Sequence, residues 1–320
     1  MIDIAIIGLG HIGKIHLDSI NSSKFFLLKA ICDVNISKYE SLVESSVKKF
    51  KDYKILLQEK DINTIIIATP NNTHFKIAKD AIQNGFNIIL EKPATDNLVR
   101  LREIESLSIK KKVKVYYSFH ASVSLETNAF LNLYLKEKKS FGELTSFNSF
   151  FYDPYLANNK LRPNAKGLEN CWLDSGINAL SVIDRFIPAS SLELIETRKT
   201  FLNGSSEVIQ SLSNTYAIKN QKGVIYGSGT IETAWDQNIN QKITYLFFGK
   251  NNKVIILDHS KQSVLENNGK GSKIIYSFSG DRLLNHYNQI LNDFYELINN
   301  NKPMNYDISY RVHSALFKNI

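Results

Sequence analysis

A glycine-rich turn near the beginning of the chain constrains its fold more than any other feature. Residues 4–7 form a short, largely β-branched apolar run, and apolar residues recur at helical spacing from Ile12 onward. Between these segments lies the pattern Gly-x-Gly-x-x-Gly, at Gly8, Gly10 and Gly13. A strand that passes through such a turn directly into a helix is typical of dinucleotide-binding α/β folds.

Each glycine of this turn has a separate physical role. Gly8 permits the tight turn, Gly10 lets the backbone approach a pyrophosphate, and Gly13 lets the helix pack closely on the strand. The pyrophosphate would lie at the free N–H groups and the positive dipole end of the helix, beside His11 and Ile12. All five residues are therefore predicted to contact the cofactor.

A carboxylate at the end of the next predicted strand supports this interpretation. The apolar stretch Phe26–Cys32 ends at Asp33, about 20 residues past the glycines, where a ribose-binding acid belongs. Asp33 can accept hydrogen bonds from both ribose hydroxyls and would repel a 2′-phosphate, so NAD is expected to be preferred over NADP. The alternative is another kind of α/β protein, in which Asp33 is a solvated loop acid.

The elements after Asp33 extend the same architecture. Strand patterns alternate with helical ones, and residues 64–68 are almost continuously apolar, as expected when helices cover both faces of a sheet. Residues 1–120 are therefore predicted to form a doubly wound parallel sheet of the Rossmann type. Further strands are expected at residues 47–50, 87–90 and 113–117, and helices at residues 37–45, 53–59, 75–84 and 98–108.

Two polar runs follow neighbouring strands of this sheet, at the edge where open α/β sheets bind ligands. The first run holds Thr69, Pro70 and Asn71, and it leads through Thr73, a predicted N-cap, to His74.

The second polar run is Glu91-Lys92-Pro93. Lys92 is either an ordinary surface lysine at a strand end or a cation beside the nicotinamide, with Pro93 fixing the turn. The spacing alone leaves both interpretations open.

Strand patterns dominate the chain after residue 120. Following a helix at residues 125–135, runs of neighbouring strands favour an open, mostly antiparallel or mixed sheet covered on one face by helices. Residues 121–320 are predicted to form this α+β domain, and its sheet is expected to build a homodimer or homotetramer. Strands are expected at residues 143–151, 192–201, 208–215, 223–233, 242–249, 254–257 and 273–277, and final helices at 283–298 and 308–317. Whether the last helix packs back on the first domain is left open.

Composition favours a globular cytoplasmic protein. The 320 residues are 43% apolar and allow two domains with substantial cores. No stretch reaches the roughly 18 apolar residues of a membrane span. Cys32 and Cys171 lie far apart and are expected to be reduced thiols, and no metal site is predicted.

The net charge of +8 does not indicate a nucleic-acid partner. The lysines occur in short runs, and no arginine cluster is interleaved with aromatic residues as nucleic-acid grooves prefer. A solvated basic surface is the better interpretation.

One predicted helix, residues 172–184, interrupts the strands and carries two polar residues near its start. Asp174 and Asn178 are four positions apart and therefore share a face. Asp174 is also compatible with an N-cap, and Asn178 with a satisfied polar group at a contact between helices. The pattern alone cannot bring this helix to Lys92.

Taken together, these motifs resemble the Gfo/Idh/MocA oxidoreductase family over essentially the whole chain. The resemblance rests on the glycine turn, the Thr-Pro-Asn…His run, Glu-Lys-Pro, and the second-domain acid followed by Asn178 where the family pattern has histidine. It implies NAD-dependent hydride transfer, with NADP less favoured. The implied cofactor contacts beyond the glycine turn and Asp33 are Thr69, Pro70, Asn71, His74, Glu91 and Lys92.

The segment Asp174–Leu180 resembles the branch of L-arabinose and D-galactose 1-dehydrogenases, where this helix reads Asp-x-Gly-Ile-Asn-Ala-Leu. That resemblance implies oxidation of an aldose at C1 to an aldonolactone, with Lys92, Asp174 and Asn178 as catalytic residues. Asp174 would be the general base, with neutral Lys92 as the alternative, and Asn178 would only orient groups because it cannot act as a base. His120 and Trp235 would line the sugar pocket, with core packing as the alternative for both.

Other functions remain open. Where that branch has a Glu-Asp pair and a Trp-His-Pro-Gly run, this chain has Tyr152-Asp153-Pro154 and residues 161–164. Another sugar, an inositol or a sugar nucleotide is therefore an alternative substrate. A non-catalytic dinucleotide-binding regulator is the alternative class, although the presence of Lys92 and Asp174 favours an enzyme.

Overall fold

The computed structural model describes residues 1–158, 160–162, 165, 168–250, 253–267, 269, 271–300 and 302–318. The chain divides into two compact units, and the first of them is discontinuous in sequence. Met1–Phe119 and Leu283–Tyr310 form the first unit, and His120–Arg282 and Arg311–Ile320 form the second. The division after residue 119 lies next to the predicted boundary, but the segment from Leu283 to Tyr310 joins the first unit and not the second.

The first unit is built on a six-stranded parallel sheet. Its strands are β1 (Ile2–Ile7), β2 (Phe26–Cys32), β3 (Lys48–Phe50), β4 (Thr64–Ile67), β5 (Asn87–Glu91) and β6 (Val115–Ser118). Their order is β3-β2-β1-β4-β5-β6. The chain adds β2 and β3 on one side of β1 and then β4, β5 and β6 on the other side, which is the doubly wound arrangement. The central strands β1 and β4 are buried except at Asp3 because helices cover both faces, which explains their mostly apolar sequence.

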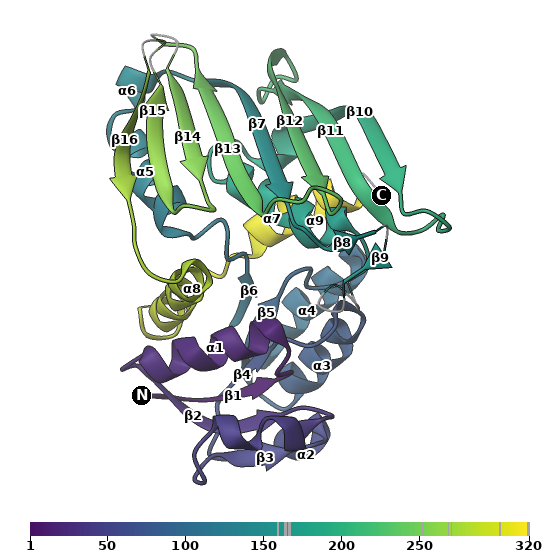
Figure 1. Cartoon of the computed structure of the whole chain (residues 1–320). Coiled ribbons are helices and arrows are strands. Elements are labelled where there is room, and N and C mark those ends of the chain that lie inside the picture. The colour runs from purple at the N-terminus through teal and green to yellow at the C-terminus, as the bar shows by residue number, and fades with distance from the viewer. Residues whose placement is uncertain are drawn as a thin grey trace. The chain divides into compact units, whose positions relative to one another are not determined.

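Helices cover this sheet from both sides (Figure 1). On one face lie α1 (His11–Ser22) and α8 (Arg282–Asn299), and on the other α3 (Asn71–Gln83) and α4 (Leu98–Lys111). The short α2 (Tyr53–Leu56) packs near β2 and β3. α8 packs beside α1 through the hydrogen bond from Ser19 to Asn288 and through the edge contact of His16 with Tyr287. Its apolar face also covers β2, where Phe294 lies against Phe26.

Two local predictions in this unit are wrong. Residues 37–45 form two 3-10 turns, Ile36–Lys38 and Glu40–Leu42, and not a helix. Neither turn buries a residue, so no tertiary packing supports a helix in this serine-rich stretch. Thr73 is not an N-cap, because α3 already begins at Asn71 and the Thr73 hydroxyl donates back to the carbonyl of Pro70.

The second unit is built on an eight-stranded mixed sheet. Its strands are β7 (Leu144–Tyr152), β10 (Leu192–Phe201), β11 (Ile209–Lys219), β12 (Ile225–Ala234), β13 (Gln241–Phe248), β14 (Val254–Asp258), β15 (Ser263–Asn267) and β16 (Ser272–Ser277). The order is β10-β11-β12-β7-β13-β14-β15-β16, and only the β12–β7 pair is parallel among these neighbours. β15 and the two-stranded β8 (Leu156–Ala157) and β9 (Lys160–Leu161) pair were not predicted.

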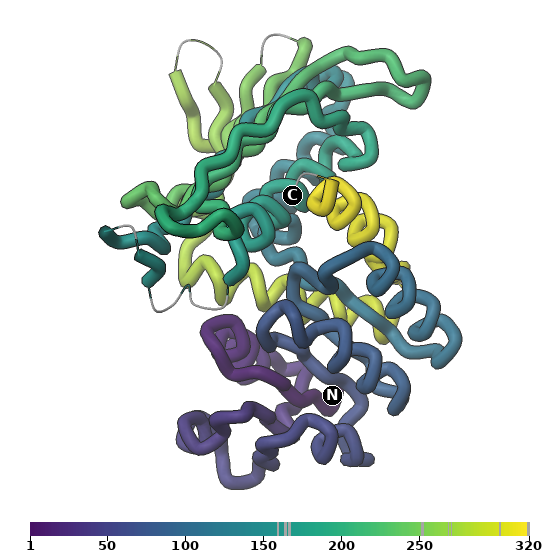
Figure 2. The backbone as a smooth tube through the Cα atoms, turned by 90° about the vertical axis from the view of Figure 1, so that its right-hand side faces the viewer, coloured from purple at the N-terminus to yellow at the C-terminus, as the bar shows by residue number. Residues whose placement is uncertain are grey.

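In the part of the chain that the structure describes, helices lie on one face of this sheet only (Figures 1 and 2). They include α5 (Leu125–Lys136), which packs under β14 to β16, the short α6 (Lys138–Phe141), and α7 (Ile177–Asp184), which packs under β7. α9 (Tyr306–Phe317) begins in the first unit and, from Arg311 on, contributes to the second. The burial of side chains along β13 alternates in agreement with this arrangement. Lys242, Thr244, Leu246 and Phe248 are buried, and the residues between them are half-buried.

Candidate active site

The predicted cofactor residues of the first unit lie at one edge of its sheet. In the strand registers, Ile7 is paired with Cys32 and with Ile67, which in turn is paired with Leu90. The glycine turn, Asp33, the Thr69 run and Lys92 each follow one of these strand ends. They therefore meet at the carboxyl edge, where doubly wound sheets bind ligands.

The glycine turn has the backbone geometry that its three roles require. Gly8 has a φ of +94°, and a Cβ there would lie 2.5 Å from the carbonyl oxygen of Ala68. A Cβ on Gly13 would lie 1.9 Å from the carbonyl oxygen of Gly8. At Gly10, by contrast, a Cβ would meet no described atom within 4 Å. Gly8 and Gly13 are thus required by the fold itself, whereas the free side of Gly10 fits a bound pyrophosphate.

Asp33 is held against the glycine turn. One carboxylate oxygen accepts a hydrogen bond from the backbone N–H of Leu9 at 2.9 Å, and the other from that of Asn35 at 2.8 Å. These bonds fix the carboxylate beside the start of α1, where His11 is exposed and Ile12 is half-buried. Each oxygen keeps a lone pair for a ribose hydroxyl.

His74 connects the two polar turns. Its side chain is buried, with Nε2 2.8 Å from the carbonyl oxygen of Thr69 and Nδ1 2.8 Å from that of Pro93. Burial lowers the pKa of His74, although both carbonyl acceptors favour its protonated ring. Thr69 is also tied to the start of α3 by a 2.7 Å bond between its hydroxyl and that of Thr73. His74 was predicted to contact the cofactor, but its burial favours holding the two turns together.

Glu91 also lies beneath the edge. It is 4% exposed, and one carboxylate oxygen accepts hydrogen bonds from Nε2 of His16 at 2.9 Å and from the hydroxyl of Ser118 at 2.6 Å. Burial alone would raise the pKa of Glu91, but these bonds and the charge of Lys92 bring it below its usual value. Glu91 was predicted to contact the cofactor, and these bonds also give it a supporting role under the Lys92 turn. Sequence reasoning missed His16 and Ser118 as its partners.

Lys92 leaves the sheet directly after β5, and its side chain is only partly buried. The bond from Lys92 to Pro93 is a cis peptide bond. Between buried Glu91 and the His74 contact at Pro93, the backbone of Lys92 is fixed on both sides. Lys92 is thus a lysine whose backbone is fixed at the carboxyl edge of the sheet.

In the second unit, Asp174 lies in a wide helical turn. Residues Trp172–Gly176 form a π-helical turn that continues directly into α7, and such turns are frequent at functional sites. Asp174 is not the N-cap, because the side chain of Asn170 accepts the N–H groups of Trp172 and Leu173 at 3.0 and 2.9 Å. Asp174 itself is only partly buried.

Asn178 lies on the first turn of α7 and is 5% exposed. Its amide nitrogen donates to the carbonyl oxygen of Asp174 at 3.3 Å. Its buried amide oxygen has no hydrogen-bond partner in the part of the chain that the structure describes. That oxygen can accept a hydrogen bond from a substrate hydroxyl.

A charged network that sequence reasoning missed lies beside this turn. Lys242 donates to Asp153 at 2.5 Å, and the other oxygen of Asp153 accepts the hydroxyl of Ser175 at 2.7 Å. Both charged side chains are more than nine-tenths buried. The signal in the sequence was a lysine at a position that shares a strand face with Leu246 and Phe248. Residues 161–164 differ from the sequence of the sugar 1-dehydrogenase branch, and Pro163 and Asn164 of this segment lie outside the described residues.

The two predicted pocket residues are both buried. His120 is 7% exposed, and Trp235 has no exposed surface. The Trp235 ring makes an edge contact with Tyr155, with centroids 5.9 Å apart. For Trp235 this favours the core-packing alternative, because a fully buried ring presents no face to a sugar.

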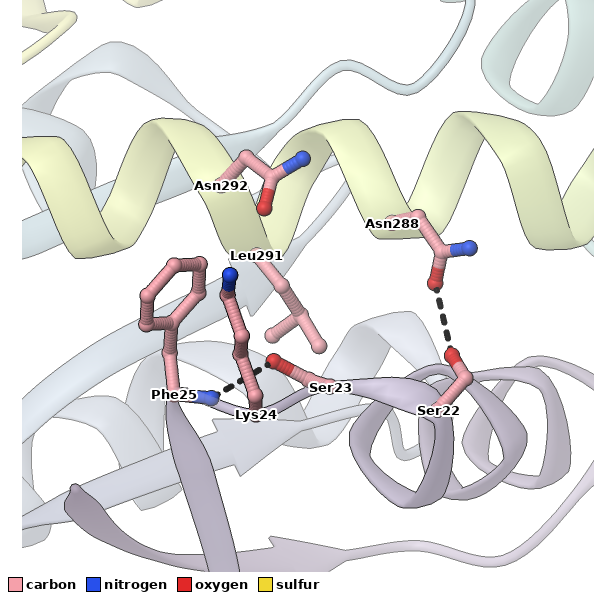
Figure 3. Close-up of a pocket in the computed structure, with 7 residues that line it drawn as sticks. All are labelled: Ser22, Ser23, Lys24, Phe25, Asn288, Leu291 and Asn292. Atoms are coloured by element: carbon pink, nitrogen blue, oxygen red, sulfur yellow. Dashed lines mark hydrogen bonds between the residues drawn. The ribbon is translucent and has the colours of Figure 1, made fainter.

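The cavity drawn in Figure 3 is a different feature, with a volume of about 290 Å³. It lies where α1 ends and β2 begins, which is the amino edge of the sheet and therefore the wrong edge for the cofactor. Its lining is short and polar apart from Phe25 and Leu291, and it consists otherwise of Ser22, Ser23, Lys24, Asn288 and Asn292.

Neither cysteine contributes a reactive group. Both are buried free thiols. Burial, with nearby Asp33 and Asp52 adding to the effect, raises the pKa of Cys32 to about 12, and burial raises that of Cys171 to about 12. Among the described residues, no group of three or more His, Cys, Asp and Glu side chains is arranged to hold a metal ion. Within the same residues, the helices also lack the combined length and hydropathy of a bilayer span.

The comparison with known families identifies the first domain. Residues 2–119 match the family model GFO_IDH_MocA, described as an oxidoreductase family with an NAD-binding Rossmann fold. Residues 2–119 are thus similar to the NAD-binding domain of that family. This agrees with the predicted fold and cofactor.

Curated relatives match a similar length of the chain. The uncharacterized oxidoreductase YrbE of Bacillus subtilis is 32% identical over 117 residues, which cover 36% of this chain and 34% of the relative. Myo-inositol 2-dehydrogenase of Thermotoga maritima is 25% identical over 119 residues, covering 37% of this chain and 36% of the relative. The match thus spans about a third of the length of these proteins. Neither is named for arabinose or galactose, so they do not support the predicted branch.

The whole two-domain fold has a match among solved structures. UDP-N-acetylglucosamine 3-dehydrogenase GnnA from Acidithiobacillus ferrooxidans superposes with a TM-score of 0.77 at 15% identity, covering 99% of this chain and 96% of that one. At this identity the likeness shows the fold alone. The likeness extends over the mixed sheet that follows residue 119.

Proposed function

We propose that this protein is an NAD-dependent dehydrogenase that oxidises a hydroxyl group of a cyclic sugar by hydride transfer. The observation that carries the proposal is the position of Lys92, which follows β5 at the same sheet edge as the glycine turn and Asp33. A dehydrogenase needs a cation beside the reacting oxygen, and Lys92 offers one at this edge.

The residues of the first unit fit the cofactor. The free side of Gly10 leaves room for the pyrophosphate, and the anchored carboxylate of Asp33 is suited to the ribose hydroxyls. Thr69, Pro70 and Asn71 border the same edge and remain predicted contacts. When bound, NAD supplies the hydride acceptor.

We expect Asp33→Ala to weaken NAD binding and to relax the discrimination against NADP. The variant loses the acceptor for the ribose hydroxyls and the negative charge that repels a 2′-phosphate. The ratio of kcat/KM for NAD to that for NADP, measured for wild type and variant, tests this. Asp52→Ala, which removes a nearby acid at the start of α2, is the matched control. A wild type that already prefers NADP would contradict the assignment.

In the proposed reaction, three side chains act on the sugar. Lys92 stabilises negative charge on the reacting oxygen as its proton leaves. Asp174 accepts that proton, either directly or through Lys92. Asn178 orients the substrate through its unpaired amide oxygen and cannot itself move a proton near neutral pH.

The replacement of a proton-transferring histidine by Asn178 favours C1 of an aldose as the site of oxidation. An anomeric hydroxyl is more acidic than a secondary alcohol, so a weaker base is sufficient, and the product is an aldonolactone. The second candidate is an inositol or a sugar nucleotide. It is supported by the relative named for myo-inositol and by the structural neighbour named for UDP-N-acetylglucosamine.

A substrate panel tests this proposal. NADH formation should be followed with L-arabinose, D-galactose, D-fucose, D-xylose, inositols and UDP-N-acetylglucosamine. We expect turnover with an aldose and release of a lactone, whereas turnover only with inositols or sugar nucleotides would select the second candidate. NAD binding without oxidation of any substrate would favour a non-catalytic regulator instead.

We propose further that a second copy of the chain covers the open face of the eight-stranded sheet. No helix of the described residues covers this face, and it carries half-buried Ile243, Tyr245 and Phe247 on β13, with Phe150 in edge contact with Tyr245. We expect sedimentation to give a dimer or a tetramer, and Tyr245→Asp to shift it toward monomer. A monomeric wild type would contradict the proposal.

A further inference from the structure

A buried histidine joins the helix after the glycine turn to the strand end that carries Lys92. His16 lies on α1 and is fully buried, and its Nε2 is 2.9 Å from Oε1 of Glu91. Glu91 is the last residue of β5, so Lys92 is its immediate neighbour along the chain. The bond from His16 therefore ends one residue before the lysine that the proposed function places beside the reacting oxygen.

Ser118 holds the same carboxylate oxygen from another element. Its buried hydroxyl, at the end of β6, donates to Oε1 of Glu91 at 2.6 Å. Burial alone would raise the pKa of Glu91, but the bonds of His16 and Ser118 bring it below its usual value, so the side chain is a carboxylate. A carboxylate only accepts hydrogen bonds, and Nε2 of His16 is therefore the donor. One oxygen is thus fixed from α1 and from β6 at once.

Among the described residues, the imidazole of His16 makes no other hydrogen bond. Its Nδ1 is buried and has no partner there. The ring packs edge-on against Tyr287 of α8, with centroids 4.6 Å apart. For packing alone, a leucine would fill this place without leaving a buried nitrogen unpaired, which costs free energy. The bond to Glu91 is therefore what a histidine adds at this position.

The turn that carries Lys92 is bonded from both faces of the sheet. On one face, α1 reaches Glu91 through His16, and on the other, α3 reaches the carbonyl of Pro93 through His74 at 2.8 Å. The residues before and after Lys92 are thus each bonded to a buried histidine. Two bonds from opposite faces fix the direction in which the chain leaves β5.

We propose that His16 is a positioning residue for Lys92, and that it acts by holding the carboxylate of Glu91 in place. His16 touches neither cofactor nor substrate in this scheme. It fixes the turn from which the Lys92 ammonium reaches the reacting oxygen, and Ser118 assists it through the same carboxylate. This role depends on the proposed function, because a fixed ammonium matters only where a reacting oxygen must be stabilised.

Acetylation of individual lysines measures how Lys92 is held, without any substrate. The protein is treated with a limiting amount of acetic anhydride, and peptide mass spectrometry gives the rate at Lys92 relative to that at exposed Lys110 on α4. In His16→Leu we expect this ratio to rise about three- to tenfold, because the half-buried Lys92 side chain is no longer fixed at its turn. His16→Gln, whose amide N–H can take the place of Nε2, should return the ratio to within about twofold of wild type.

Turnover gives a second reading once a substrate is known. In His16→Leu, kcat should fall about ten- to a hundredfold, since a small displacement of a catalytic group costs that much. The affinity for NAD should stay within about twofold of wild type, because the glycine turn and Asp33 are unchanged. His16→Gln should recover most of the turnover. A loss of NAD affinity with unchanged kcat would overturn the inference and assign His16 to support of the glycine turn.

A matched control separates positioning from a general loss of packing. Ser19 is a fully buried residue of the same helix whose hydroxyl donates to Asn288 of α8 at 2.6 Å. Ser19→Ala should lower the thermal stability and leave the acetylation ratio unchanged. If His16→Leu does not fold, Ser118→Ala removes the other bond to the same oxygen and should raise the ratio. An unchanged ratio in folded His16→Leu or in Ser118→Ala would overturn the inference, and so would an equal rise in Ser19→Ala.

Protection by NAD distinguishes a failure of this inference from a failure of the proposed function. Saturating NAD should slow the acetylation of Lys92 in wild type, because the proposed function places this lysine beside the nicotinamide. A wild type that NAD does not protect would overturn the proposed function. The comparison of His16→Leu with His16→Gln needs neither NAD nor substrate, so it tests the positioning of Lys92 by itself.

Discussion

Replacing Lys92 with alanine is expected to lower turnover by about three orders of magnitude and to leave the affinity for NAD nearly unchanged. The loss is large because the ammonium is the charge that the proposed site offers to the developing oxyanion at the cofactor edge. Cofactor binding should persist because the glycine turn, Asp33 and the Thr69 run do not depend on the Lys92 side chain. The backbone of the turn that carries Lys92 is held by Glu91 and by the His74 contact at Pro93.

The measurement combines steady-state kinetics with direct titration of NAD. Lys79→Ala is the matched control, because Lys79 is a lysine of the same unit that forms an exposed ion pair with Glu103 at 2.6 Å. Its removal should change neither quantity. Full turnover by the Lys92 variant would remove its assigned role, and a parallel loss of NAD affinity would reassign it to cofactor binding.

Gly13→Ala is expected to lower the stability of the fold, whereas Gly10→Ala is expected to weaken NAD binding. At Gly13 the new Cβ would lie 1.9 Å from the carbonyl oxygen of Gly8, so the turn must move and the fold loses about 1–3 kcal/mol or more. At Gly10 the apoprotein has room for the methyl group, which would occupy the space expected for the pyrophosphate. Gly10→Ala should therefore keep its stability and weaken NAD binding about ten- to a hundredfold.

Thermal unfolding of the apoproteins and NAD titration separate these effects. Gly85→Ala is not a neutral comparison, because Gly85 has a φ of +86°, which strains any L side chain. Asn84→Ala at the end of α3, an exposed site far along the helix from the cofactor edge, is the better control. Normal NAD affinity in Gly10→Ala would place the pyrophosphate elsewhere.

The first unit could be predicted from sequence because its signals are local. The strand Phe26–Cys32 was predicted with its observed bounds, because six of its seven residues are apolar. A Cβ on Gly8 would clash with Ala68, and a Cβ on Gly13 would clash with the carbonyl oxygen of Gly8, so this turn requires glycine at both positions. The carboxyl-edge location of Asp33 and Lys92 follows from the topology alone.

The supporting contacts could not be predicted, because they join residues distant in sequence. His16 and Glu91 are 75 positions apart, and Lys242 and Asp153 are 89 positions apart. Each buried polar group needs a partner, but the partner is set by which strands and helices become neighbours. His74 is the intermediate case, because the motif marks it but does not reveal that its two ring nitrogens face the carbonyls of two separate turns.

The return of α8 to the first unit has a consequence for biosynthesis. The side chains that α8 covers, among them Phe26 and His16, belong to segments that leave the ribosome long before α8 does. Until then, an apolar flank of the nascent nucleotide-binding layer lacks its native cover and is a natural target for chaperones. Expression of residues 1–119 as an isolated fragment would reproduce that immature state permanently.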